Sequence, residues 1–270
     1  MENFTIVKNN KISLKDFSPE DTENLSKDNI NDEYLCLQEK FSEFQNILYA
    51  SKKFSLLIIL QGMDCSGKDG TAKKILSGIN PNGFNVKSFK EPTQEELSHD
   101  YLWRVHKYCP SMGNITIFNR SYYEDVLITR VHRQINDTIA FKRFKEINKF
   151  EKYLINNNIL VLKFFLHISK DFQREKIEER LKNPKKHWKF SLSDLKERNF
   201  WDKYQQCYED IICNCSTKKA PWHIIPSNNR WFRDYIILKI IVNNLQSLKL
   251  EYPKTNDNIQ ALINELNNSR

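Results

Sequence analysis

The segment that decides the fold is Ser55-Leu56-Leu57-Ile58-Ile59-Leu60-Gln61-Gly62-Met63-Asp64-Cys65-Ser66-Gly67-Lys68-Asp69-Gly70. The apolar run at residues 56–60 predicts a buried strand. The pattern Gly62-x4-Gly67-Lys68 follows it without a spacer, and residues that can begin a helix come next. Strand, glycine-rich loop and helix in this order are the context that a phosphate-binding P-loop requires. The alternative is a plain glycine-rich turn between a strand and a helix.

The chemistry of this loop suits a chain of linked phosphates. Glycines let successive backbone N–H groups turn inward, the helix N-terminus adds partial positive charge, and Lys68 can reach a terminal phosphate. We therefore predict that Lys68 is catalytic. The remaining loop positions predicted to bind phosphate are Gly62, Ser66, Gly67, Asp69 and Gly70.

Two acidic residues depart from the common P-loop. The position after Lys68 usually carries Ser or Thr, whose hydroxyl holds Mg²⁺, and here it is Asp69. Asp64 would repel phosphate unless a divalent cation lay between them, and Mg²⁺ is typically held by one or two carboxylates plus substrate phosphates. We predict that Asp64 is a catalytic ligand of Mg²⁺ or Mn²⁺; the alternative is a turn residue that caps its own backbone.

Composition indicates an ordinary soluble globular protein. The chain has 270 residues, of which 40% are hydrophobic and 28% charged, and this length suits one large domain. No apolar run approaches a membrane span, no secretory signal is recognisable, and the six cysteines show no paired CxxC spacing. We therefore expect a cytoplasmic protein with reduced thiols and no membrane partner.

The net charge of +8 favours association with polyanions, but it does not choose among nucleic acid, a membrane surface and phosphate chains. Ordinary solubility is the alternative explanation of the surplus.

Hydrophobic periodicity predicts alternating strands and helices. Helices are expected at residues 30–53, 68–78, 93–107, 138–156, 195–212 and 236–248, and strands at residues 56–60, 84–89, 114–118, 159–168 and 222–227. This pattern predicts a P-loop kinase-like, three-layer α/β/α fold with about five parallel strands and a helical lid.

Three segments are expected along the chain. Residues 1–30 are predicted to form a loosely packed N-terminal arm. Residues 31–250 form the P-loop phosphotransferase domain, with the lid at about 170–195, and residues 251–270 form a C-terminal tail. A short helix in that tail would serve docking or self-association.

Two basic residues stand at predicted strand ends, where ligands of open α/β sheets bind. Lys90 ends the second strand and is predicted to contact a phosphate or nucleotide. Arg120 follows the third strand, where its guanidinium can grip phosphate oxygens in a bidentate way, so we predict that it is catalytic. Asn119 stands where the Walker B carboxylate is expected.

Four further residues are predicted to bind the nucleotide, and three of them have structural alternatives. Asp100 and Arg104 are i,i+4 neighbours, so they could form a solvated ion pair. Ser121-x-x-Glu124 is a capping-box pattern, so Glu124 could only stabilise a helix start. Asp125 lacks such an explanation and is a candidate metal or sugar ligand.

The most basic stretch lies at residues 169–193, after the fourth predicted strand. Lys176 and Arg180 are a like-charge i,i+4 pair, which costs stability unless an anion lies across them. A cationic helical hairpin broken at Pro184 could close over phosphates and exclude water. We predict that Lys176, Arg180 and Lys189 bind phosphate, the alternative being a solvated basic loop.

Several motifs in order resemble the polyphosphate kinase 2 family between about residues 56 and 238. They are Gly-Met-Asp-Cys-Ser-Gly-Lys-Asp-Gly at 62–70, Phe-Lys-Glu-Pro-Thr at 89–93, His-Asp-Tyr-Leu-Trp-Arg at 99–104, Asn-Arg-Ser-Tyr-Tyr-Glu-Asp-Val-Leu at 119–127, Trp-Lys-Phe-Ser at 188–191, Ala-Pro-Trp at 220–222 and Arg-Trp-Phe-Arg at 230–233. The resemblance implies a Mg²⁺-dependent, homo-oligomeric enzyme that moves phosphoryl groups between inorganic polyphosphate and nucleotides.

By that similarity Asp64 binds metal, Lys68 and Arg120 bind phosphates, and Lys176, Arg180 and Lys189 lie on the lid. Asn119 replaces the Asp of other members and resembles the subgroup associated with AMP as well as ADP, which leaves a second metal ligand unassigned. The predicted substrates are inorganic polyphosphate and nucleoside mono- or diphosphates, namely ADP, GDP and AMP.

Two rival functions stay open on the sequence. An ATP-dependent nucleotide or nucleoside kinase would share the loop and the lid. A basic nucleic-acid-binding module is the non-catalytic rival, although the chain carries no RNP-like motif, zinc finger or basic arm, so no specific nucleic-acid partner is expected.

Overall fold

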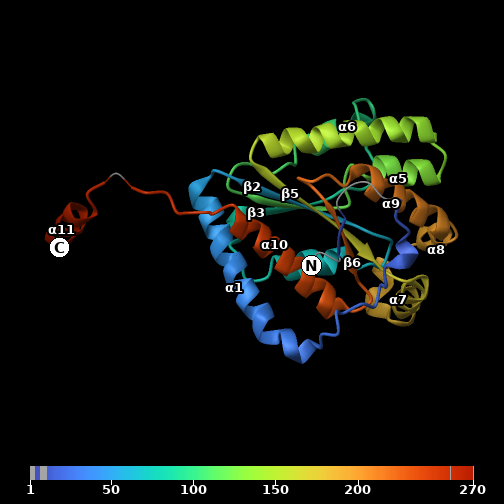
Figure 1. The fold of residues 1–270 in the computed structure, drawn as a ribbon, viewed down its shortest axis with the longest axis horizontal. Coiled ribbons are helices and arrows are strands. Elements are labelled where there is room, and N and C mark those ends of the chain that lie inside the picture. Colours follow the sequence, from blue (N-terminus) through green and yellow to red (C-terminus); the bar gives the residue numbers. More distant parts are fainter. Residues whose placement is uncertain (1–3, 7–10, 256, 270) are drawn as a thin grey trace.

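The computed structural model describes residues 4–6, 11–255 and 257–269. These residues form one sheet with helices on both faces (Figure 1). Its strands are β1 (Thr5–Ile6), β2 (Ser55–Gln61), β3 (Phe84–Ser88), β4 (Ile115–Asn119), β5 (Ile159–His167) and β6 (Trp222–Pro226). Their order is β1-β6-β5-β2-β4-β3, and every neighbouring pair is parallel except β1 with β6.

Two layers of helices complete the fold. The helices are α1 (Lys27–Ser51), α2 (Lys68–Ile75), α3 (Gln94–Leu97), α4 (Trp103–His106), α5 (Glu124–Val131), α6 (Asp137–Asn156), α7 (Lys170–Lys182), α8 (Leu192–Arg198), α9 (Trp201–Cys215), α10 (Arg230–Ser247) and α11 (Ile259–Asn268), with short 3-10 turns η2 (Leu14–Asp16), η3 (Pro81–Gly83) and η4 (Pro184–Lys189). Residues of α1, α2 and α10 form one hydrophobic cluster, and residues of α5, α6 and α9 form the other. The three-layer architecture expected from the sequence is confirmed.

Strand β2 lies at the centre because it is apolar on both faces. All seven of its residues are buried, as expected for a parallel strand covered by helices on both sides. Leu57 and Ile59 face the α5, α6 and α9 layer, whereas Leu56, Ile58 and Leu60 face the α1, α2 and α10 layer. The phosphate loop therefore begins from a rigid central strand.

The N-terminal arm differs from its prediction. Phe4 and Leu14 are buried at 3% and 2% exposure, and Thr5–Ile6 adds an antiparallel sixth strand to β6. The prediction of a loosely packed arm therefore does not hold at Phe4, Leu14 and β1. The sequence did not reveal β1 because two residues are too few to show an alternating pattern.

Two predicted helices are each divided in the structure. The helix expected at residues 93–107 is interrupted between α3 and α4, because Asp100 Oδ1 accepts the backbone N–H groups of Leu102 and Trp103 at 3.0 and 3.2 Å and so starts a new helix. The helix expected at residues 195–212 is divided into α8 and α9. Capping boxes form at Thr93/Glu96, before α3, and at Ser191/Asp194, before α8.

The C-terminal tail extends away from the domain and ends in α11 (Figure 1). Its apolar residues Ile259, Leu262, Ile263 and Leu266 are 45–71% exposed. Within residues 4–6, 11–255 and 257–269, no helix is long and apolar enough to cross a membrane.

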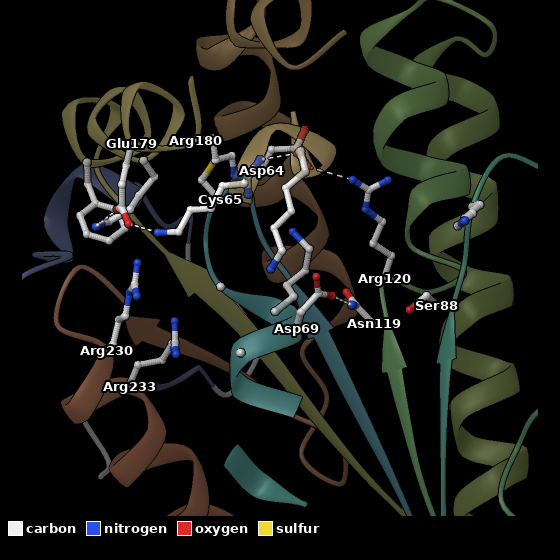
Figure 2. Close-up of a pocket in the computed structure, with 18 of the residues that line it drawn as sticks. Asp64, Cys65, Asp69, Ser88, Asn119, Arg120, Glu179, Arg180, Arg230 and Arg233 are labelled. Carbon is white, nitrogen blue, oxygen red and sulfur yellow. Dashed lines mark hydrogen bonds and ion pairs between the residues drawn. The ribbon is translucent and has the colours of Figure 1, made fainter. Parts of the chain in front are cut away.

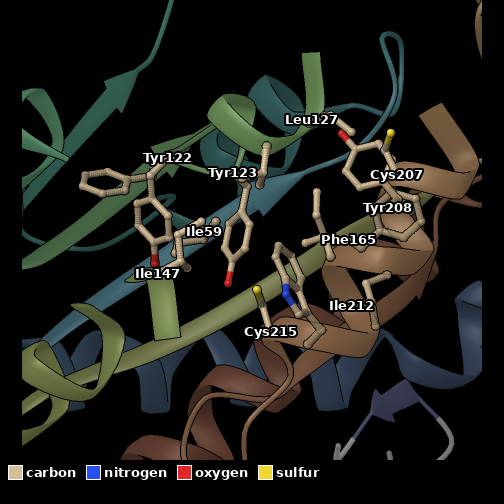
Figure 3. Packing of buried hydrophobic residues seen from close by; sticks show 14 of the residues in the cluster. Ile59, Tyr122, Tyr123, Leu127, Ile147, Phe165, Cys207, Tyr208, Ile212 and Cys215 are labelled. Atoms are coloured by element: carbon tan, nitrogen blue, oxygen red, sulfur yellow. The ribbon is translucent and has the colours of Figure 1, made fainter. Parts of the chain in front are cut away.

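A buried ion pair joins β5 to α6 beneath the site. Lys163 Nζ lies 2.6 Å from Glu151 Oε2, and the side chains are 0% and 1% exposed. Glu151 Oε1 also accepts the hydroxyl groups of Tyr122 and Tyr123 at 2.8 and 2.7 Å, and Lys163 donates to the Cys215 carbonyl at 2.6 Å. Figure 3 shows Tyr122, Tyr123 and Cys215 in the surrounding cluster.

We expect the substitution Glu151→Ala to destabilise the protein by about 3–5 kcal/mol, because it leaves the Lys163 charge buried without its partner. Urea unfolding followed by circular dichroism measures this change. Lys142→Ala is the control: it removes an exposed i,i+4 pair with Glu146 at 3.8 Å and should cost less than about 1 kcal/mol. Equal losses in the two variants would contradict the prediction.

Candidate active site

A cavity of about 620 Å³ opens where the carboxyl ends of the parallel strands meet. Its wall comes from the loop after β2, the ends of β3 and β4, the helices after β5 and the first turn of α10 (Figure 2). The basic residues of the wall are Lys68, Lys90, Arg120, Lys176, Arg180, Lys186, Lys189, Arg230 and Arg233, and its acidic residues are Asp64, Asp69 and Glu179. This excess of positive charge suits a highly anionic ligand.

The phosphate loop has the backbone geometry that its glycines allow. Gly67 has φ +94°, and a Cβ placed there would lie 2.0 Å from Arg233 Nη1. Gly62 has φ +154°, and a Cβ there would lie 2.7 Å from the Leu166 carbonyl oxygen. Side chains are therefore excluded at both positions, and Gly67 caps the start of α2 at Lys68.

Lys68 is buried against this loop. Its Nζ donates to the carbonyl oxygens of Gly62 and Met63 at 2.7 and 3.1 Å, and to Ser66 Oγ at 3.4 Å. Burial, assisted by the nearby Arg120 charge, lowers the pKa of Lys68 below the ordinary lysine value, although Asp64 acts in the opposite direction. A phosphate oxygen placed beside this ammonium would favour its charged form.

Arg120 pairs with Asp64 across the cavity. Arg120 Nη2 lies 2.9 Å from Asp64 Oδ1, and both side chains are partly exposed. The backbone of Arg120 is left-handed, with φ +62°, and its N–H donates to the Leu60 carbonyl at 3.0 Å. This strained turn at the end of β4 brings the guanidinium beside the phosphate loop.

Asn119 and Asp69 form a second polar pair in the wall. Asn119 Nδ2 donates a short hydrogen bond to Asp69 Oδ1. Both positions depart from the common P-loop, and the structure brings the two departures into contact (Figure 2). The amide therefore holds the Asp69 carboxylate where a Ser or Thr hydroxyl is usual.

The predicted lid lies over the cavity as α7, η4 and α8. Lys176, Arg180 and Lys189 all line the cavity, and so does Lys90 at the end of β3. Gln173 Nε2 on α7 donates to the Asp64 carbonyl oxygen at 3.0 Å, while Arg198 at the end of α8 donates to Gln173 Oε1 at 2.9 Å. Helix α7 is thus bonded directly to the phosphate loop, and α8 is bonded to α7.

The structure adds residues that were not assigned from the sequence. Arg233 donates from Nη1 to the Ser66 carbonyl at 3.2 Å and pairs with Asp234 at 2.7 Å. Arg230, Lys186 and Glu179 also line the cavity. Two arginines three positions apart after the last strand were the available signal for Arg230 and Arg233, since such a pair shares one helix face.

The four predicted nucleotide-binding residues lie outside the cavity wall. Arg104 is 4% exposed; it donates to the Lys90 carbonyl at 2.9 Å and lies 3.7 Å from Asp125. It does not pair with Asp100, whose carboxylate caps α4. Burial raises the pKa of Asp125 to about 6. Through Arg104, this carboxyl is linked to the Lys90 carbonyl. A nucleotide contact by any of the four stays a prediction.

Glu124 does not form the capping box considered for it. Its Oε1 accepts a hydrogen bond from Gln61 Nε2 at 3.1 Å, and α5 begins without a side-chain cap. Ser121 Oγ instead accepts the Tyr123 N–H at 3.2 Å. Gly62 and Ser66, predicted phosphate contacts, also lie outside the wall and shape the loop from behind.

Comparison with known proteins identifies the family. Residues 24–253 match the family described as Polyphosphate kinase 2. The chain belongs to the polyphosphate kinase 2 family. A member from Arthrobacter aurescens, Polyphosphate Kinase 2, has a crystal structure that superposes with a TM-score of 0.93 at 35% identity, covering 98% of this chain and 96% of that one.

Two curated relatives of this chain carry activity names. The AMP/ADP-polyphosphate phosphotransferase of Meiothermus ruber is 41% identical over 267 residues, which cover 98% of this chain and 100% of the relative. The ADP-polyphosphate phosphotransferase of Rhodopseudomonas palustris is 42% identical over 229 residues, which cover 80% of this chain and 79% of the relative. The family assignment made from the ordered motifs is thereby confirmed.

Proposed function

We propose that this polyphosphate kinase 2 transfers a phosphoryl group between inorganic polyphosphate and ADP, GDP or AMP by direct in-line displacement. The observation that carries the proposal is the cavity itself. It joins a phosphate loop, Arg120 and a cationic lid in a single wall with a large excess of basic residues. Two polyanions can meet end to end only where such charge offsets their repulsion.

The residues of the cavity suit catalysis by position and charge. The attacking oxygen of a nucleotide phosphate is already ionised near neutral pH, so the reaction needs no strong general base. Lys68 and Arg120 would hold the transferred phosphoryl group from two sides. The lid would hold the polyphosphate chain and keep water away from the reacting phosphorus.

The carboxylates of the cavity fit a Mg²⁺ ion held jointly with substrate. In the described residues no group of three or more His, Cys, Asp or Glu side chains could hold a metal by itself, but Asp64 faces the cavity beside Arg120. Mg²⁺ commonly takes one or two carboxylates, substrate phosphates and waters. We propose Asp64 as its protein ligand. When bound, the ion would neutralise phosphate charge.

The acceptor range includes AMP in this proposal. The Meiothermus ruber relative, which matches almost the whole chain, is named for both AMP and ADP. Asn119 lies in the cavity wall as a neutral residue, so it adds no negative charge beside the acceptor phosphate.

The deciding assay supplies polyphosphate, Mg²⁺ and AMP, ADP or GDP without ATP, and detects the higher phosphate by chromatography. We expect ATP from ADP and ADP from AMP, with EDTA abolishing both. Products that form only when ATP is the donor would reject the proposal and favour an ATP-dependent nucleotide kinase. Salt-sensitive DNA binding without turnover would favour a nucleic-acid-binding module.

Self-association is part of this proposal, as expected for the family. The exposed apolar residues of α11 support it. Light scattering coupled to size exclusion would reject it if the protein eluted with the mass of one chain.

We expect Lys189→Ala to weaken polyphosphate use more than nucleotide use, because Lys189 lines the lid side of the cavity. Loss of one charge-assisted contact should raise the KM for polyphosphate about tenfold. Lys182→Ala is the matched control, since Lys182 is 79% exposed and pairs with Glu178. An unchanged KM for polyphosphate in Lys189→Ala would count against this role.

A further inference from the structure

One carboxylate of the lid, Glu179, lies in the wall of the mostly basic cavity. Glu179 lies on α7 and lines the cavity beside Arg180 (Figure 2). Its Oε2 lies 3.1 Å from Lys176 Nζ, and its Oε1 accepts a short hydrogen bond from Lys186 Nζ. Both lysines line the cavity as well. A single negative side chain therefore joins two cations from the two arms of the lid, α7 and η4.

Helix capping explains the position of another lid acid, Asp194, but it does not explain the position of Glu179. Asp194 pairs with Arg180 at 3.3 Å, but it also completes the capping box of α8 by accepting the Ser191 N–H. Glu179 lies three residues before the C-terminal end of α7, where it caps no helix start. The hydrogen bonds that it receives come from the two lysines, which are the groups that a phosphate chain would seek.

We propose that Glu179 is an internal counter-ion that occupies Lys176 and Lys186 in the absence of substrate and is displaced by polyphosphate, thereby setting the affinity of the lid for the chain. This inference rests on the proposed function. The carboxylate lowers the repulsion among closely placed lid cations when no phosphate is bound. When phosphate binds, the same carboxylate opposes it, so affinity falls and release of the shortened chain becomes easier.

The position of Glu179 allows such a displacement. Its side chain is 41% exposed, so it can rotate into solvent without a change in the backbone of α7. Hydrogen bonds from Lys186 and Lys176 lower its pKa to about 2, so the carboxylate stays ionised at the pH of the reaction. Release of the lysines therefore has to come from competition by an anion and not from protonation.

The direct test measures binding of linear polyphosphate of defined length by isothermal titration, without nucleotide. Each partly exposed ion pair changes an equilibrium constant by up to about fivefold, so Glu179→Gln should bind about threefold to tenfold more tightly than the wild type. Its KM for polyphosphate should fall by a similar factor, whereas its KM for ADP should stay the same. Its affinity should also fall more steeply with salt, because two freed lysines then pair with phosphate.

Three matched variants separate charge from packing. Glu179→Asp keeps the charge and should restore affinity close to that of the wild type. Glu178→Gln removes the neighbouring carboxylate, which pairs at 3.5 Å with Lys182 outside the cavity wall, and should leave polyphosphate binding unchanged. Glu179→Ala removes the carboxylate without adding an amide that could form new hydrogen bonds, so it should also bind polyphosphate more tightly than the wild type.

Equal or weaker polyphosphate binding by folded Glu179→Gln and Glu179→Ala would overturn the inference and make Glu179 an organiser of the lid. Thermal melting and circular dichroism establish that each variant is folded. Absence of polyphosphate-driven phosphorylation in the wild type would overturn the proposed function instead. The two failures are therefore distinguishable.

Discussion

Replacing Lys68 with alanine is expected to lower turnover about a thousandfold, the loss found when one preorganised donor to transition-state charge is removed. Lys68 extends from the first residue of α2 over the phosphate loop, and its ammonium is buried within it. The charge that develops on the transferred phosphoryl group would lose its nearest buried cation. The rate is measured with saturating polyphosphate, ADP and Mg²⁺.

The fold should survive this change. Lys68 is bound to carbonyl oxygens of its own loop and not to the core, so the thermal midpoint should change little. Lys73→Ala provides the control, because Lys73 is an exposed lysine of the same helix and should keep near-normal activity. A folded Lys68→Ala enzyme with near-normal rates would reject the assignment of Lys68.

The substitution Asp64→Asn should lower turnover at least about a hundredfold by weakening the metal site, since Mg²⁺ prefers charged carboxylate oxygens. The amide oxygen of asparagine can still accept the hydrogen bond that Arg120 donates at 2.9 Å, so the position of the guanidinium is retained. The two effects of Asp64, metal binding and orientation of Arg120, are thereby separated.

A metal-binding measurement shows whether the loss of turnover in Asp64→Asn comes from a weaker metal site. Binding of Mn²⁺ in the presence of ADP is followed by electron paramagnetic resonance and should weaken in Asp64→Asn. Asp171→Asn replaces an exposed carboxylate in the first turn of α7 and should behave as the wild type. Normal metal binding and normal turnover in Asp64→Asn would show that Asp64 only shapes the loop.

The local sequence predicted those residues of the site that come immediately after a strand in the chain. The apolar run of β2, the spacing of Gly62 and Gly67, and the lysine after them lie within one short segment, so their geometry depends on neighbours in the chain. The same holds for Lys90 after β3 and Arg120 after β4. Parallel strands place their carboxyl ends at one edge, and all of these residues lie there.

Predictions failed where the partner was distant in the chain. The pairing of β1 with β6 joins Thr5 to His223, and no local pattern marks it. The alternative of a solvated Arg104–Asp100 ion pair is also absent, because the Arg104 guanidinium is directed to the Lys90 carbonyl and to Asp125. The sequence pattern around a helical arginine does not distinguish a buried arginine that bonds to the protein from an exposed one that contacts a ligand.

The sequence by itself determined the five parallel strands, most of the long helices, the phosphate loop, the basic lid and the family. These features depend on hydrophobic periodicity, glycine spacing and charge density, which are properties of short segments of the chain. Only the tertiary structure decided which charges meet: Asp64 with Arg120, Asn119 with Asp69, Arg233 with the Ser66 carbonyl, and Glu179 with two lid lysines. Such pairs form between residues from different elements, and their contacts depend on how whole layers pack.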